Sequence, residues 1–166
     1  TSTHHNLGRR LVLQPDGKIA LVGTVTVGAG NQCGIARFES NGTLDSGFGI
    51  GGQVLVPVST GCFNANIQPD GKLVIAGNDS VGDVTYGTFI RLLRTGALDA
   101  GFGDSGVQDI SSFGTPTRVA FTSGGNLVTG LAIQDPADGV LKSYVVELTT
   151  TLTGPWVAQT ITFNAL

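Results

Sequence analysis

Residues 13–24 read LQPDGKIALVGT and residues 67–78 read IQPDGKLVIAGN, so the same segment is written twice, 54 residues apart. A second segment recurs with the same spacing, because GTLDSGFGIGG at 42–52 is followed by GALDAGFGDSG at 96–106. Two segments that share one period belong to one duplicated structural unit, which a chance repetition of a single turn would not produce. The period therefore decides which folds are open to the chain.

A third and degenerate copy follows at the same spacing. Residues 121–132 read FTSGGNLVTGLA and keep the turn glycine as Gly125. A fixed period of this kind marks a solenoid, a propeller or an array, in which no unit can bury its hydrophobic face alone. Three units use almost the whole chain, so we expect one repeat domain over 1–166, with units at about 5–58, 59–112 and 113–166.

The charge and hydropathy of the chain argue against two classes of function. Lys and Arg number 9 against 12 Asp and Glu, and the resulting net charge of −3 provides no attraction to nucleic acid. No stretch approaches the roughly 20 apolar residues that cross a bilayer. We therefore expect neither a nucleic-acid partner nor a membrane span.

Each unit reads as four short strands separated by turn residues. In the first unit the apolar runs fall at 10–14, 18–25, 34–39 and 53–58. No window of helical length carries apolar residues at helical spacing without an interrupting Gly or Pro. Four antiparallel strands at this period predict an all-β fold, a β-propeller-like array of three four-stranded antiparallel blades.

The turn between the first two strands of a unit has its own signature. Pro15 presets φ at the first corner, Asp16 binds its own backbone, and Gly17 takes the left-handed position that closes the hairpin. The second unit repeats this turn with Pro69, Asp70 and Gly71. These residues are therefore structural anchors of the repeat.

A long glycine-rich connection follows the third strand and carries two apolar residues, Leu44 and Phe48 in the first unit. We interpret both as packing anchors that tuck beneath the sheet, and an aromatic platform for a ligand is the alternative for Phe48. The aspartate between them, Asp45, is expected to accept backbone N–H bonds of the turn. The corresponding residues of the later units are Leu98, Asp99 and Phe102, and then Leu152 and Trp156.

The two cysteines, Cys33 and Cys62, are compatible with one disulfide or with two buried thiols. Cys33 lies at the start of the third predicted strand of the first unit, and Cys62 lies at the start of the second unit. An up-and-down strand order places both at the same end of the blades. A disulfide also requires Cα atoms about 4.4 to 6.8 Å apart, and sequence leaves both alternatives open.

The connection between the second and third strands differs in every unit. It is glycine-rich and uncharged at 25–32, whereas the later units place acidic and aromatic residues there. Shared scaffolds with divergent loops present binding surfaces, so these loops are the candidate binding sites, with solvated connections as the alternative. Oxygen ligands in the second loop also raise a Ca²⁺ site, although the spacing matches no EF-hand. The candidate residues are Asn78, Asp79, Asp83, Tyr86, Asp135, Asp138 and Tyr144.

No catalytic constellation is evident in the sequence. The only histidines, His4 and His5, are adjacent near the beginning of the chain, so a Ser-His-Asp or Cys-His device has no base within the repeats. The glycine-rich segments precede no helix that could bind a phosphate, and no zinc spacing occurs. We expect no catalytic residue, no metal, no cofactor and no enzymatic activity.

The combination QPDGK-I/L-x-x-x-G, then a strand ending in AR-F or IR-L, then N/T-G-x-LD-x-x-FG-x-x-G resembles the delta-60 repeat family of bacterial proteins. The match covers residues 13–52 and 67–106 and is weak from 121 onward. The resemblance implies a β-propeller type of repeat in an exported or surface-attached bacterial protein, with a periplasmic location as the alternative. It supplies no catalytic residues, because the function of the family is poorly defined.

Three hypotheses for function follow. Propellers close with about 4 to 8 blades, so three blades leave outer faces that need a cover, either from a longer natural chain of which this is a piece or from self-association. The first hypothesis is a non-enzymatic extracellular structural and interaction module, completed or stacked by association with further chains. Its partners would be other copies in a homo-oligomer or filament, or another cell-surface protein. The second is a carbohydrate-binding, lectin-like propeller that uses the divergent loops, and the third is an enzyme acting on polysaccharide through their acidic residues.

Overall fold

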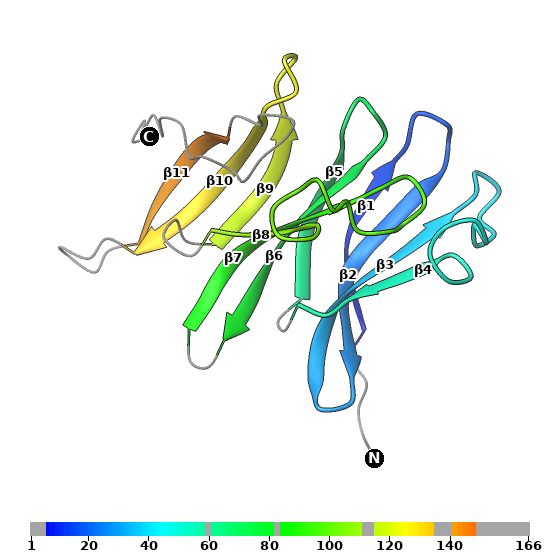
Figure 1. Ribbon diagram of the computed structural model, residues 1–166, viewed down its shortest axis with the longest axis horizontal. Coiled ribbons are helices and arrows are strands. Elements are labelled where there is room, and N and C mark those ends of the chain that lie inside the picture. The colour runs from blue at the N-terminus through cyan, green and yellow to red at the C-terminus, as the bar shows by residue number, and fades with distance from the viewer. Residues whose placement is uncertain (1–5, 59–60, 82–83, 111–114, 135–140, 149–166) are drawn as a thin grey trace.

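The computed structural model describes residues 6–58, 61–81, 84–110, 115–134 and 141–148, and within them the chain forms three antiparallel sheets and no helix (Figure 1). We call these sheets blades 1, 2 and 3. The predicted all-β, propeller-like array is therefore confirmed. The fourth strand expected in blade 3 falls outside the described residues.

The strands of each blade follow one another in chain order. Blade 1 contains β1 (Leu7–Leu13), β2 (Ile19–Val27), β3 (Gly30–Phe38) and β4 (Gln53–Val56). Blade 2 contains β5 (Gly61–Ile67), β6 (Leu73–Val81), β7 (Val84–Leu92) and β8 (Val107–Asp109). Blade 3 contains β9 (Thr115–Phe121), β10 (Leu127–Gln134) and β11 (Leu141–Leu148).

The first hairpin turn of each blade is built as its residues dictate. In blade 1 the amide of Gln14 donates to the carbonyl of Lys18 at 2.8 Å, and Gly17 has a φ of 83°. The carboxylate of Asp16 accepts from the amide of Lys18 at 3.1 Å, which stabilises the corner of the turn. Blade 2 repeats these contacts, with Gly71 also at a φ of 83°. Blade 3 lacks the Pro-Asp pair, yet Gly125 keeps a φ of 85°.

The second hairpin is tighter than its sequence suggests. We expected a loop over 25–32, but β2 and β3 stay paired as far as Val27 opposite Gly30. Gly28, with a φ of 63°, allows a two-residue connection, so the strands extend almost to their joint end. In blade 2 the pairing likewise continues to Val81 opposite Val84. The predicted divergent loops are therefore largely strand in both blades.

The core consists of two layers, each lying between neighbouring blades. We call the face of a blade that looks toward the blade before it the front face, and the opposite face the back face. The back face of blade 1, with residues such as Val22 and Ile35, packs on the front face of blade 2, with Ile75 and Ile90. The second layer joins the back face of blade 2 to the front face of blade 3. Figure 1 shows the three sheets standing side by side in this order.

Of the two apolar anchors predicted in each glycine-rich loop of blades 1 and 2, only the phenylalanine is buried. Phe48 and Phe102 are each only 2% exposed and belong to the two core layers. Leu44 and Leu98 are 43% and 38% exposed, so they are not buried anchors. The reason is that the backbone of Leu44 bridges to Phe38 at the edge of the blade, which leaves its side chain over the glycine corner. Leu152 and Trp156 lie outside the described residues.

Candidate functional site

A charged cluster lies beneath the glycine-rich loop of blade 1. The carboxylate of Asp45 is 5% exposed and bonds the guanidinium of Arg37 at 2.7 Å and the ammonium of Lys18 at 2.8 Å. Its second oxygen accepts from the amide of Gly47 at 3.0 Å. The guanidinium of Arg37 also stacks 4.3 Å from the ring centre of Phe48, a cation–π contact. The cluster therefore ties the loop to β3 through Arg37 and to the turn before β2 through Lys18.

Blade 2 repeats this cluster at the period of 54 residues. Arg91 bonds Asp99 at 2.8 Å, Lys72 lies 3.1 Å from the same carboxylate, and Arg91 stacks 4.5 Å from the ring centre of Phe102. Blade 3 departs from the pattern, because Val145 stands where blades 1 and 2 have arginine. The cluster is thus a building element of the two well-matched repeats, in which every charge has an opposite neighbour.

The charges around both aspartates shift their titration. The ammonium of Lys18 holds the pKa of the Asp45 carboxyl well below its usual range, with help from Arg37 and the Gly47 amide and against the effect of burial. Burial would raise the pKa of Asp99, but Lys72, the Gly101 amide and Arg91 outweigh it, and the pKa is lowered. Both carboxylates therefore favour the folded state when ionised.

Acid should weaken the fold through these two aspartates. A carboxyl whose pKa is lower in the folded state than in the unfolded state stabilises the fold above about pH 4, and that stabilisation is lost as the pH falls further. We expect the urea concentration at the midpoint of unfolding to fall as the pH is lowered below about 4. Asp45→Asn should be less stable at neutral pH and should show a flatter pH dependence in acid. Unfolding curves between pH 7 and 2 measure this, with the exposed Asp104→Asn as control, and equal slopes for Asp45→Asn and wild type would contradict it.

A turn of blade 2 locks onto the glycine-rich loop of blade 1. The guanidinium of Arg37 donates to the carbonyl of Arg94, and the amide of Gly49 donates to the carbonyl of Thr95 at 2.8 Å. A Cβ atom at Gly96 would lie 2.9 Å from the amide nitrogen of Gly49, so only glycine fits this close approach. At the equivalent glycine of blade 1, Gly42, a Cβ atom would meet nothing within 4 Å.

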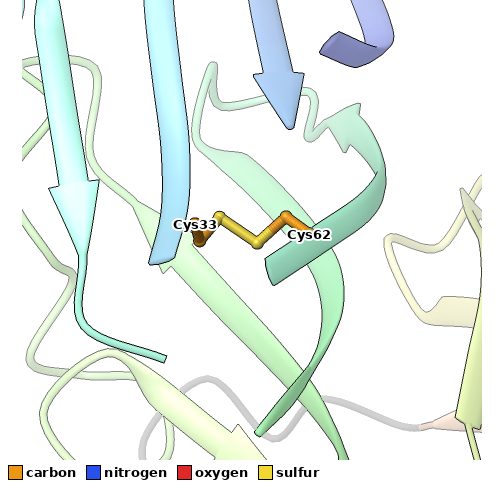
Figure 2. The surroundings of a disulfide bond; sticks show 2 residues. All are labelled: Cys33 and Cys62. Carbon is orange, nitrogen blue, oxygen red and sulfur yellow. A yellow bond between two sulfur atoms is a disulfide. The ribbon is translucent and has the colours of Figure 1, made fainter. Parts of the chain in front are cut away.

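The two cysteines form a disulfide that crosses from blade 1 to blade 2 (Figure 2). Cys33 lies on the back face of blade 1 in β3, Cys62 lies on the front face of blade 2 in β5, and their Cα atoms are 5.1 Å apart. Both are fully buried. The bond therefore joins the two blades inside their shared core layer.

The structure describes four of the candidate loop residues, and these lie in strands of blades 2 and 3. Asn78 and Asp79 lie within β6, and Tyr86 lies in β7 directly opposite Asp79. Tyr144 lies in β11 opposite Leu131. Asp83, Asp135 and Asp138 fall outside the described residues. Strands, rather than an open loop, thus hold the candidate residues that the structure describes.

Among the residues that the structure describes, no group of three or more His, Cys, Asp or Glu is placed to hold a metal ion. Within the same residues, no helix is long and apolar enough to cross a bilayer.

An apolar surface that the sequence did not single out covers the front face of blade 1. Leu11, Leu13 and Leu55 are 62%, 70% and 53% exposed, and none of them belongs to the buried layer between blades 1 and 2. A cavity of ≈ 350 Å³ lies on the same face and is lined in part by Leu7 and Leu21. The signal was present in the sequence as the apolar run Leu11, Val12 and Leu13 at the end of β1, but only the stacking of the blades shows which of these residues lie on the open face.

The repeat period relates the front face of blade 1 to the front face of blade 2. Shifted by 54 residues, Leu11 and Leu21 become Ala65 and Ile75, both 0% exposed on the front face of blade 2. Most other positions of the face also become buried or half-buried residues of the same core layer, namely Ile67, Leu73, Ile90, Leu92 and Val107. The front face of blade 1 is therefore built like a blade-to-blade interface.

Two segments of the chain, residues 14–48 and 68–102, match a family described as domain of unknown function (DUF5122) beta-propeller. Each segment runs from the first hairpin turn to the buried phenylalanine, so it contains the whole charged cluster of its blade. No curated protein matches the chain. The protein is thus a β-propeller-like array with two repeats similar to that family, whose description leaves function open.

Proposed function

We propose that this chain is a non-enzymatic extracellular structural and interaction module, a partial propeller of delta-60 type that continues its blade array by association with a further chain. The observation that carries the proposal is the front face of blade 1. Most of its positions match, at the repeat period, residues buried between blades 1 and 2, yet Leu11 and Leu13 stay more than half exposed. Exposed apolar surface of this kind marks interaction sites in soluble proteins.

The inter-blade disulfide supports the extracellular part of the proposal. Disulfides persist in oxidising compartments, such as the outside of a bacterial cell, and are rare where thiols are kept reduced. The bond between Cys33 and Cys62 is fully buried and joins two core faces, which is the placement of a structural bridge. A surface or secreted location in a bacterium fits this chemistry.

Light scattering of the purified chain tests the association. We expect a mass above the 17.0 kDa of one chain that rises with concentration. Leu11→Asp should weaken the association at least about 10-fold, because a carboxylate would have to leave water in the interface. Ile50→Asp is the matched control, since Ile50 is 91% exposed in the glycine-rich loop and blade 2 carries Asp104 at the equivalent position. A wild-type mass of one chain at every concentration would refute the proposal.

A further inference from the structure

The chain presents both halves of a blade-to-blade interface. One half is the open front face of blade 1, described above. The other half is the back face of blade 3, where Val145 is 53% exposed, Ala120 is exposed and Val128 is partly exposed. In the register of the sheet, Ala120 lies beside Val128, which places both side chains on the same face. Within the chain, a back face of this kind covers a front face twice.

The contacts between blades 2 and 3 show which residues would meet. The amide of Val119 on the front face of blade 3 donates to the side-chain oxygen of Asn64 at 3.2 Å, and Asn66 donates to the carbonyl of Val119 at 3.2 Å. Moved back by two periods, Val119 becomes Leu11 of blade 1. Moved forward by one period, Asn64 and Asn66 become Arg118 and Ala120 of blade 3. Leu11 would thus pack against Arg118 and Ala120 of a docked blade 3.

The sizes of these residues are complementary. Between blades 1 and 2, the equivalent positions are Val12 on the back face and Ala65 on the front face, and both are buried. On the two open faces the sizes are exchanged. The smaller residue, Ala120, is on the back face of blade 3, and the larger residue, Leu11, is on the front face of blade 1. A small residue opposite a large one fills the same space, so the exchange keeps the packing volume of the interface.

We propose that the partner of the open front face is a second copy of this chain, which docks the back face of its blade 3 there in the geometry of the internal blade interfaces. The inference rests on the proposed function and names the partner. A contact between two different surfaces is heterologous, so it propagates from copy to copy and generates either a closed ring or a filament. Two copies would give a ring of six blades, within the range of known propellers.

The native disulfide supplies a geometric probe for this docking. Cys33 and Cys62 face each other between blades 1 and 2, and two-period and one-period shifts carry them to Leu141 and Gly8. If one copy follows another as blade 2 follows blade 1, Gly8→Cys of the following copy lies beside Leu141→Cys of the copy before it. A Cβ atom at Gly8 would meet only the end of the Leu21 side chain, at 3.1 Å, so blade 1 can accept the cysteine.

The experiment mixes two variants of the full chain that each carry one added cysteine beside the native disulfide, Gly8→Cys and Leu141→Cys, under mild oxidation and separates the products on a non-reducing gel. We expect the mixture to yield a disulfide-linked species of two chains that contains one of each variant, as mass spectrometry would show. Each variant alone should yield at least about 10-fold less linked product. In a heterologous contact, the same position of two copies never lies side by side. Circular dichroism confirms that each variant is folded.

The outcomes separate this inference from the proposed function. Linked dimers of Gly8→Cys alone would mean that two front faces pair with each other, which overturns head-to-tail docking. An assembled wild type whose variants give no mixed product would also overturn it, while the proposed association with a further chain would stand. A wild type that stays at the mass of one chain refutes both.

Discussion

Replacing Phe48 with alanine should lower the free energy of unfolding by about 3 to 5 kcal/mol, the usual loss for a buried aromatic side chain. Phe48 is 2% exposed in the layer between blades 1 and 2, so its removal leaves a cavity at the point where the glycine-rich loop meets the core. The variant also deprives Arg37 of the ring on which its guanidinium stacks. Urea or guanidinium unfolding at neutral pH measures the loss.

The neighbouring anchor gives a matched control for this result. Leu44 lies in the same loop but is 43% exposed, and surface substitutions usually change stability by about 0.5 kcal/mol or less. We expect Leu44→Ala to cost far less than Phe48→Ala. Equal losses for both variants would contradict the assignment of Phe48 as the buried anchor of the loop.

Removing the disulfide should have a comparable effect. The bridge closes a loop with a sequence separation of 29 residues, and cross-linking a loop of this length stabilises the folded state by about 3 to 4 kcal/mol through the entropy of the unfolded chain. The double variant Cys33→Ala with Cys62→Ala should therefore unfold at a clearly lower denaturant concentration. Loss of packing at two fully buried positions adds to the effect.

The control for the disulfide keeps the sequence and changes only the bond. Wild-type protein unfolded in the presence of a reductant should lose most of the stability that the double variant loses. A double variant with the wild-type midpoint would show that the bond contributes nothing to holding blades 1 and 2 together. Mass spectrometry of the oxidised wild type confirms that the bond is formed.

The local parts of the fold could be predicted because they depend on neighbours in sequence. The turn at Pro15, Asp16 and Gly17 needs a fixed φ, a side chain that binds its own backbone and a left-handed residue, and these three residue types supply them. The repeat period then extended the prediction from one turn to a whole blade. Strand number and order follow from the same local signals.

The parts that sequence missed depend on contacts between distant residues. Leu44 is a large apolar residue, which is typical of a buried anchor, but its side chain remains on the surface. Beneath the loop, Arg37 stacks on Phe48 instead. The divergent connections looked like loops, although Gly28 permits a turn so short that the strands run to its edge. Which face of β1 is open follows only from the stacking of blades, and no pattern within β1 shows it.

Blade 1 is built like an internal blade, and we propose that a further chain supplies the blade before it. Electron microscopy of the wild-type particle, isolated at the mass that light scattering gives, tests this claim most directly. We expect particles in which blades continue across the junction between chains with the same step as within a chain, and in which Leu11 is covered. Particles of three blades, or chains that touch away from the front face of blade 1, would contradict it.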